Sequence, residues 1–269
     1  MGSVSPISPL NDIEFLARSE HRVTALAALA RRPQSRTDLR VMTGVSQSTI
    51  GRTLREFEER RWIIREGAHY EATPLGSYLA TGMREFVDRV EVEQLLRDIW
   101  HLLPDAESGF TVDMCAEATI TIGDVADPYR PIDRFLDLLG ETTELRFAGF
   151  DIALIAPCKS ELCQRIIDGM CTEIIGPPSV VNHIRSSYPK EFEETLASGN
   201  LTVRVHDSLP HYGIGIFDGR IAISGYNPNR GTVEALLDTD STEACEWAES
   251  VYRSYRREVP TIAIESNAK

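Results

Sequence analysis

Apolar residues recur at helical spacing in three segments near the start of the chain. Residues 19–32, 35–44 and 46–62 each place apolar side chains three or four positions apart, and Ser46 has the short hydroxyl that often caps a helix. Residues 62–76 follow a different pattern, with two short runs rich in β-forming residues on either side of a Glu-Gly pair. The pattern therefore predicts three helices followed by a β-hairpin.

That order of elements is typical of a winged helix-turn-helix, which we expect over residues 12–75. The turn "TGVSQSTIGR" carries the strongest signal. Gly44 permits two helices to cross closely, Val45 fills the turn, and the next helix begins with short polar side chains that can approach base edges. A helical hairpin with no role in binding is the alternative, and the β-hairpin after it argues against this alternative.

The first turns of the third predicted helix supply candidates for contact with DNA. Gln47 can bond adenine and Arg52 can bond guanine in the major groove, whereas Arg55 is placed to meet a phosphate. Ser46 is expected to be structural, as the helix cap. A solvated helix face is the alternative for each arginine. The residues expected to contact double-stranded DNA are Arg36, Gln47, Ser48, Thr49, Arg52, Arg55, Arg65 and His69.

The helical pattern resumes at Leu75 and continues to Leu103, just before Pro104. Its apolar residues form a heptad-like stripe, and a long helix of this kind between two domains usually pairs with its own copy. We therefore expect a linker helix over residues 76–104 that makes the protein a homodimer. Packing of the stripe on its own chain is the alternative.

Beyond Pro104, segments rich in β-branched residues alternate with helical ones, which predicts an α/β domain over residues 105–260. The fold class of the whole chain is thus α/β, or α+β overall. We expect a sheet covered on both faces, with an antiparallel hairpin near Asp218 and Gly219. The predicted strands are 117–124, 144–154, 171–177, 200–207, 212–219, 220–228 and 231–239, and the predicted helices are 131–141, 159–170, 179–199 and 241–259.

Charge separates the two parts of the chain. Residues 1–75 carry 11 arginines against nine acidic residues, whereas the rest carries 17 basic against 32 acidic residues, for a formal net charge of −13. A slightly basic first domain suits an anionic partner. Only three lysines accompany 25 arginines, as in proteins of salt-loving archaea; an arginine-rich, high-GC bacterial proteome is the alternative. No segment resembles a signal peptide or could span a membrane, so we expect a cytoplasmic protein without a membrane partner.

The stretch "HYGIGIFDGR" resembles a phospholipase D-type motif that lacks one part. Such enzymes use His-x-Lys-x-x-x-x-Asp, and His211 and Asp218 fit this spacing, but Gly213 stands where the lysine would neutralise developing phosphoryl charge. A phosphodiesterase is therefore only a distant alternative. We expect no enzymatic activity and no cofactor. The pattern is either a chance match or a former catalytic pocket that now binds a ligand.

Polar residues after the predicted strands are candidates for that ligand site, because α/β sheets bind ligands at the carboxyl ends of their strands. Histidine, carboxylate and tyrosine side chains together suit a polar metabolite. A solvated loop is the alternative for each residue taken singly. The candidates are Asp124, His206, Asp207, His211, Tyr212, Tyr226 and Asn227.

The cysteines allow a second kind of regulator. Cys158, Cys163 and Cys171 lie close together in the sequence, so they could serve as a redox or soft-metal sensor. The chain has five cysteines and no CxxC motif, which argues against a zinc knuckle. Scattered, packed thiols are the alternative.

The segments 128–139, "PYRPIDRFLDLL", and 188–258, from "YPKEFEETLASG" to "RSYRRE", resemble the sensor domain of archaeal regulators of the FilR type, named after a methanogenesis regulatory protein. The resemblance covers most of residues 115–258, and a winged helix at the front matches the family's arrangement. It implies a DNA-binding transcription regulator. The related TrmB-type sugar-sensing regulators carry a phospholipase D-like sensor, so the resemblance also implies that fold for this domain. We therefore expect a homodimeric regulator that responds to a small-molecule effector.

Overall fold

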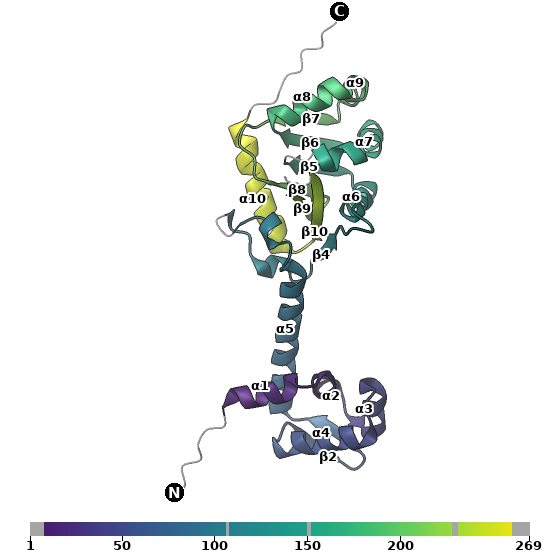
Figure 1. Cartoon of the computed structure of the whole chain (residues 1–269), viewed down its shortest axis with the longest axis vertical. Coiled ribbons are helices and arrows are strands. Elements are labelled where there is room, and N and C mark those ends of the chain that lie inside the picture. Colours follow the sequence, from purple (N-terminus) through teal and green to yellow (C-terminus); the bar gives the residue numbers. More distant parts are fainter. Residues whose placement is uncertain (1–7, 106–107, 150–151, 228–230, 260–269) are drawn as a thin grey trace, which may run out of the picture. The chain divides into compact units, whose positions relative to one another are not determined.

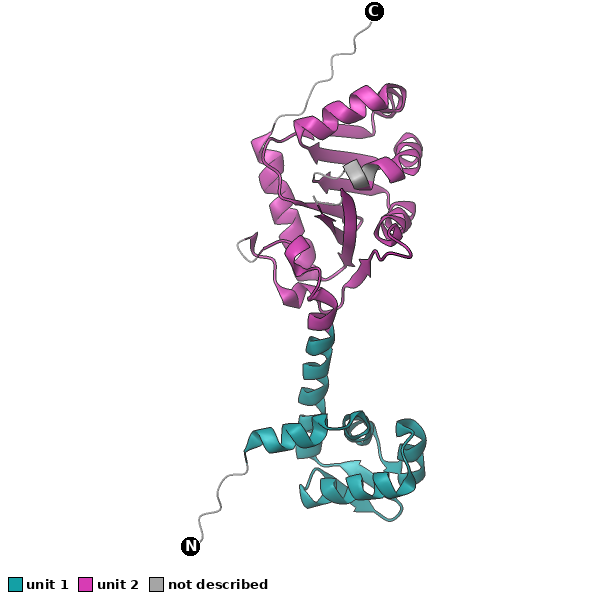
Figure 2. Ribbon diagram, viewed as in Figure 1, with its two compact units in different colours: residues 1–91 teal, residues 92–269 magenta. Residues whose placement is uncertain are grey.

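The computed structural model describes residues 8–105, 108–149, 152–227 and 231–259, and it has the predicted α/β fold class. The chain forms two compact units, residues 1–91 and residues 92–269 (Figure 2). Each unit has its own apolar core. Within the described residues, no helix is both long enough and apolar enough to cross a membrane.

Unit 1 has the order of elements of a winged helix-turn-helix. Its three strands are antiparallel in the order β1-β3-β2, and the apolar faces of its helices enclose a core that includes Leu26, Leu54 and Phe57. The first helix and the first strand were not predicted. The elements are α1 (Pro9–Ala17), α2 (Glu20–Arg31), β1 (Gln34–Ser35), α3 (Arg36–Thr43), α4 (Gln47–Glu59), β2 (Ile63–Glu66), β3 (His69–Ala72) and the first part of α5 (Pro74–Leu96).

Local chemistry fixes the two helices of the central motif. Ser35 and Asp38 form a capping box at the start of α3, and Gly44 ends this helix with a left-handed φ of 69°. The Ser46 hydroxyl then accepts a hydrogen bond from the Thr49 amide at 3.2 Å, so it caps α4 as predicted. Gly44 thus ends α3, and Ser46 satisfies one of the amides at the start of α4 two residues later.

A glycine allows α5 to begin directly against the hairpin. A Cβ atom on Gly76 would lie only 1.9 Å from the Trp62 carbonyl oxygen, so no other residue fits here without backbone movement. The Thr73 hydroxyl accepts a hydrogen bond from the Gly76 amide, and the Thr73 amide donates to the same Trp62 carbonyl. The first turn of α5 is therefore tightly joined to the start of β2.

Unit 2 contains a seven-stranded mixed sheet in the order β4-β10-β9-β8-β5-β6-β7 (Figure 1). Only β5, β6 and β7 run parallel to one another, and every other pairing is antiparallel. The predicted hairpin is confirmed: Phe217 pairs with Arg220, and Gly219 between them has a φ of 106°. The strands are β4 (Thr119–Ile122), β5 (Glu144–Ala148), β6 (Cys171–Gly176), β7 (Leu201–Val205), β8 (Tyr212–Phe217), β9 (Arg220–Asn227) and β10 (Thr232–Thr239).

Helices cover both faces of this sheet, as predicted. The long α10 crosses one face together with two short 3-10 segments, and the other helices lie on the opposite side (Figure 1). Two separate apolar cores result, one on each face. The helices are α6 (Arg130–Glu141), α7 (Ile152–Ile167), α8 (Pro178–Ser187), α9 (Pro189–Ala197) and α10 (Thr242–Glu258), and the 3-10 segments are η1 (Trp100–Leu102) and η3 (Val112–Cys115).

Three predicted elements differ from the structure. The strand expected at 144–154 ends at Ala148, and α7 starts at Ile152, because an apolar run fits a buried strand or a buried helix equally well. The helix expected at 179–199 is divided at Tyr188, since proline at the next position favours a new helix start.

The third difference concerns the stripe that was expected to continue to Leu103. The helix α5 ends at Leu96, and the apolar residues at its end and beyond, Leu96, Ile99, Leu102 and Leu103, are buried in the core of unit 2. Of the other stripe residues, Leu79 and Met83 pack against the core of unit 1, whereas Phe86 and Leu95 are 56% and 52% exposed. Tyr78, on the same helix, is 80% exposed.

Candidate nucleic-acid interface and ligand sites

The helix α4 has one apolar face that packs in the core and one exposed polar face. Ile50, Leu54 and Phe57 are buried in the core of unit 1. On the outer side, the side chains of Gln47 and Arg52 are exposed, as are those of Ser48 and Arg55. A helix of this kind can lie in the major groove with its first turns toward the bases.

The two arginines of this face have no carboxylate partner among the described residues. Arg55 donates from Nε to the Gly51 carbonyl at 3.4 Å, and Arg52 forms no ion pair within the described ranges. Arginine keeps its charge at any physiological pH and offers a fork of donors. Both guanidinium groups are thus available to phosphate or to guanine.

The other residues predicted to contact DNA differ in how far internal hydrogen bonds hold their side chains. Arg36 donates from Nη2 to the Tyr70 hydroxyl at 3.2 Å and lies beside Gly51, so it connects α3, α4 and the hairpin. Arg65 donates from Nε to the Gly67 carbonyl at 2.9 Å at the tip of the hairpin, and the His69 side chain is exposed. These positions flank α4 and suit contact with the DNA backbone.

The small hydroxyls at the start of α4 belong partly to the cap. Both Ser48 Oγ and Thr49 Oγ1 lie 2.9 Å from Ser46 Oγ. Sequence reasoning missed a further contact: His21 Nε2 lies 3.1 Å from Thr53 Oγ1, which joins α2 to α4. Partial burial lowers the pKa of His21, and the positive charges of Arg22 and Arg52 lower it further, which favours the neutral imidazole. No sequence motif announced this pair.

In unit 2, the strand directions bring all seven candidate ligand residues to one edge of the sheet, but not to one site. Asp124 follows β4 and His206 follows β7, which are the two outermost strands. Six strand spacings of about 4.8 Å separate them by roughly 29 Å. The candidates therefore form separate groups along the edge rather than one pocket.

The outer groups have structural partners. Asp124 accepts hydrogen bonds from the amides of Ala126 and Asp127 at 2.7 and 2.8 Å, which closes a tight turn. The buried His206 accepts from the Ser208 amide at 3.0 Å, and its Nε2 lies 3.1 Å from a Glu258 carboxylate oxygen. Asp207 beside it is exposed.

The central group combines a buried tyrosine with more accessible neighbours. Tyr212 pairs with Gly225 in the sheet and is buried, and desolvation raises its pKa to about 12. The exposed His211 stacks edge-on against it, with ring centroids 5.5 Å apart. Tyr226 and Asn227 end the neighbouring strand and are half-buried. Tyr212 therefore acts mainly as a core residue.

The two ends of the phospholipase-like motif lie far apart. His211 precedes β8 and Asp218 follows it, so the strand of six residues separates them by roughly 20 Å. Asp218 accepts hydrogen bonds from the amides of Thr143 and Glu144 at 2.7 and 2.8 Å. Partial desolvation raises the pKa of Asp218, but these hydrogen bonds outweigh that effect and hold the pKa below its usual range. Asp218 fastens the hairpin to β5.

The three candidate sensor thiols do not converge on a metal site. Cys158 and Cys163 lie on α7, and Cys171 begins β6. Among the described residues, no group of three or more His, Cys, Asp or Glu side chains could hold a metal ion. Burial raises the pKa of Cys158 to about 12 and also raises that of Cys163, which disfavours the reactive thiolate form.

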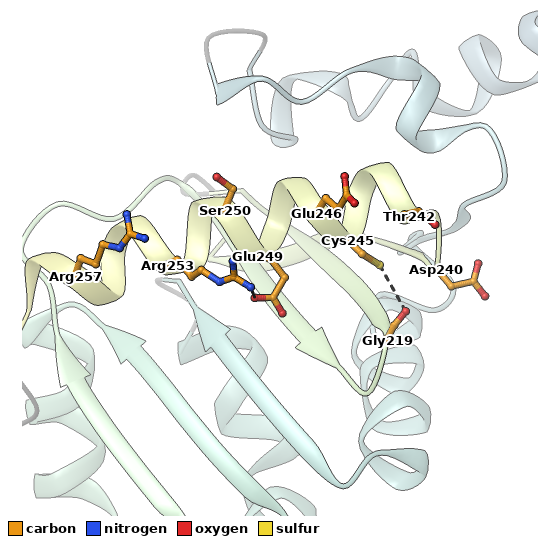
Figure 3. A pocket seen from close by; sticks show the side chains of 9 residues that line it. All are labelled: Gly219, Asp240, Thr242, Cys245, Glu246, Glu249, Ser250, Arg253 and Arg257. Atoms are coloured by element: carbon orange, nitrogen blue, oxygen red, sulfur yellow. Dashed lines mark hydrogen bonds and ion pairs between the residues drawn. The ribbon is translucent and has the colours of Figure 1, made fainter.

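A surface groove of about 500 Å³ runs along α10 beside the β8–β9 hairpin (Figure 3). Part of its charge is already paired internally, since Glu249 contacts Arg253 at 3.3 Å and also pairs with Arg146. None of the predicted ligand residues lines it. The lining residues are Gly219, Asp240, Thr242, Cys245, Glu246, Glu249, Ser250, Arg253 and Arg257.

Two family models match the chain. Residues 128–258 match the family described as "Methanogenesis regulatory protein FilR1, middle domain", and residues 10–95 match the "HVO_A0261 N-terminal domain" family. The second match covers most of unit 1, and the first lies within unit 2. No curated protein matches the chain.

Several solved structures are partly similar. TrmBL2, an archaeal chromatin protein with a novel mode of DNA binding, is 14% identical with a TM-score of 0.45, over 95% of this chain and 100% of that one. The MarR family protein RV2887 of Mycobacterium tuberculosis is 18% identical with a TM-score of 0.29, over 36% and 86%. Phosphatidylserine synthase of Haemophilus influenzae is 16% identical with a TM-score of 0.41, over 54% and 39%. At these sequence identities and TM-scores, no property of the three proteins can be assigned to this chain.

Proposed function

Because the chain belongs to the archaeal FilR-type regulators, we propose that this DNA-binding transcription regulator works as a homodimer whose unit 2 senses a small molecule. The outer face of α4 carries the proposal. It combines a capped helix start, exposed Gln47 and Ser48, and two arginines without a carboxylate partner among the described residues. A cytoplasmic location follows from the role.

The experiment begins with a duplex selected from random sequences by the full-length protein. Mobility-shift titrations of that duplex and of a scrambled duplex are then compared at several salt concentrations, including the multimolar salt that suits an acidic, lysine-poor chain. We expect tighter binding to the selected duplex at every salt concentration. Equal binding to the two duplexes would contradict operator recognition, and no binding to either would contradict the proposal as a whole.

An apolar surface on unit 1 supports the homodimer. Leu75, Tyr78 and Phe86 are spaced three and eight positions apart, on one side of α5, and all are exposed. A groove of about 880 Å³ lies between this side and α1, where Ile13 is also exposed. Exposed apolar surface of this extent usually marks an interface.

Oligomeric state tests the dimer directly. Light scattering on wild-type protein should give the mass of a dimer, and Tyr78→Asp should give the mass of a monomer, because a carboxylate in an apolar interface is desolvated without a partner. Tyr129→Asp is the matched control, since Tyr129 is an exposed tyrosine of unit 2. A monomeric wild type would exclude the homodimer.

We also propose that the chain does not hydrolyse phosphodiesters. Gly213 lies inside β8 and carries no cation, and Asp218 is occupied by the hydrogen bonds that fasten the hairpin. Incubation with bis(4-nitrophenyl) phosphate should release no nitrophenolate above the rate without protein. Turnover that disappears in His211→Ala would overturn this proposal.

A further inference from the structure

A small apolar cavity lies in unit 2 beneath α8 and α9, away from the ligand residues that the sequence predicted. Its volume is about 60 Å³. The helices α7 and α9 pack against each other, α8 packs on α9, and α9 contacts β7. Apolar side chains from these helices and from β6 and β7 line it, among them Leu162, Ile174, Val181, Ile184 and Val203.

The topology favours a ligand at this place. The cavity reaches Gly149 and Gly176, which mark the carboxyl ends of the parallel strands β5 and β6. Ligands of α/β proteins bind at this end of parallel strands. A Cβ atom on Gly176 would lie 3.4 Å from the Val181 side chain, so glycine lets α8 approach the strand end closely.

The lining of the cavity includes a cation, Lys159, which is one of only three lysines in the chain. Lys159 Nζ lies 3.0 Å from a carboxylate oxygen of Glu191 and 4.0 Å from the ring centroid of Tyr188. Tyr188 forms the corner between α8 and α9, and Glu191 lies on the first turn of α9. The pair therefore joins α7 to the α8–α9 corner.

The two partners differ in exposure. The Lys159 side chain is 25% exposed, whereas that of Glu191 is 41% exposed. An incoming anion can take the place of Glu191, because the glutamate can turn toward water while the lysine stays over the tyrosine ring. An incoming amine would instead have to displace the more enclosed lysine.

We propose that this cavity binds a short-chain, apolar carboxylate, whose carboxylate pairs with Lys159 in place of Glu191 and whose hydrocarbon part fills the cavity. A water needs about 10–15 Å³ of such volume, so the space admits a molecule of only a few non-hydrogen atoms. The inference rests on the proposed function, because binding would release Glu191 and loosen α9 from α7, which is a change that a regulator can use.

Isobutyrate is a suitable probe, with isobutyramide and isobutylamine as neutral and cationic molecules of nearly the same shape. Calorimetric titration of the full chain without DNA should show saturable binding of isobutyrate, on the order of millimolar for so small a ligand. Neither analogue should bind. Saturable binding of isobutylamine without isobutyrate would overturn the proposal, as would equal binding of all three.

Three variants assign the binding to the cavity. Lys159→Met should weaken isobutyrate binding at least tenfold, and Glu191→Gln should strengthen it several-fold because the competing carboxylate is gone. Lys190→Met is the matched control, since Lys190 lies beside Glu191 on α9, is 83% exposed and is absent from the cavity lining. Unchanged binding in both Lys159→Met and Glu191→Gln would contradict the site.

Titrations of the selected duplex with and without isobutyrate separate this inference from the proposed function. A chain that binds the duplex but not isobutyrate would disprove the cavity's ligand and leave DNA recognition intact. A chain that binds isobutyrate in a Lys159-dependent manner without any change in DNA affinity would establish the site and disprove its role in sensing.

Discussion

Arginine has different surroundings in the two units. In unit 1, the arginines around α4, namely Arg36, Arg52, Arg55 and Arg65, have no carboxylate partner among the described residues. In unit 2, arginines on the sheet and on α10 pair repeatedly with acids, as Arg134, Arg146, Arg204, Arg220, Arg253 and Arg256 do. Arginines around α4 thus lack carboxylate partners among the described residues, whereas these arginines of unit 2 are neutralised by acids.

The difference suits two roles, binding an external anion in unit 1 and internal stabilisation in unit 2. Exposed arginines without partners cost little, because water solvates them, and they can pair with an external anion such as phosphate. Paired arginines cannot do so without breaking an internal contact, and they instead hold an acidic domain together. Asp238 illustrates this role: it is fully buried and contacts both Arg134 and Arg220, at 2.8 and 2.7 Å.

The largest effect should come from removing that shared carboxylate. Asp238→Ala leaves Arg134 and Arg220 without their common partner and should lower the free energy of unfolding by about 3–5 kcal/mol. The cost should lie near the lower limit, because both guanidinium groups are partly exposed. Urea denaturation measures it. Asp240→Ala, which removes an exposed partner of Arg220, should cost no more than about 1 kcal/mol. Equal costs would contradict the distinction.

Removing a free arginine should change DNA binding and leave stability unchanged. Arg52→Ala should weaken binding to the selected duplex by about 1–3 kcal/mol, because a base contact is lost, and should alter the free energy of unfolding by less than about 0.5 kcal/mol. Mobility-shift and urea titrations measure the two quantities. Arg18→Ala is the control, since Arg18 pairs with Glu14 on α1. Wild-type affinity in Arg52→Ala would remove this residue from the interface.

A smaller change should distinguish phosphate contacts from base contacts. Arg55→Ala should weaken binding to selected and scrambled duplexes about equally, and the slope of log affinity against log salt should become shallower by roughly 0.9. A salt series for both duplexes measures this change. Loss confined to the selected duplex would mean that Arg55 reads a base instead.

The smallest effect should be present at neutral pH and disappear in acid. The pKa of Asp218 in the folded state lies below its usual range, so its stabilising hydrogen bonds persist above about pH 4 and are lost as the pH falls through the folded-state pKa. Asp218→Asn should therefore be less stable than wild type at neutral pH, and this difference should shrink below about pH 4. Thermal melts across pH measure it, with Asp127→Asn as an exposed control. A difference that does not depend on pH would contradict the ionised role.

Local sequence signals predicted the elements whose chemistry is also local. Ser46 and Gly44 predicted the helix-turn-helix, and Gly219 predicted the hairpin, because caps and tight turns depend on a few neighbouring residues. The strand segments of unit 2 were found by their β-branched composition. Their order was not, since pairing depends on contacts between residues distant in the sequence.

The candidate ligand residues show the same limit. The rule that ligands bind at carboxyl ends of strands found one edge of the sheet, but it could not say that Asp124 and His206 follow the outermost strands. The cavity beneath α8 and α9 gave no sequence signal, because Lys159 and Glu191 are 32 positions apart and the lining consists of ordinary apolar residues. For the same reason, the pairing between His21 and Thr53 was not foreseen.

The passage of α5 over Gly76 limits how a signal can reach the recognition helix. With the Trp62 carbonyl in direct contact, the helix has no room to pivot at its first turn, and Trp62 is itself packed in the core that holds α4. In the proposed regulator, a displacement transmitted along α5 would therefore reorient unit 1 as a whole without deforming it. If the chain is the homodimer that we propose, regulation would then change the distance between its two copies of unit 1 on the duplex, and each copy would keep its sequence preference whether or not the proposed effector is bound.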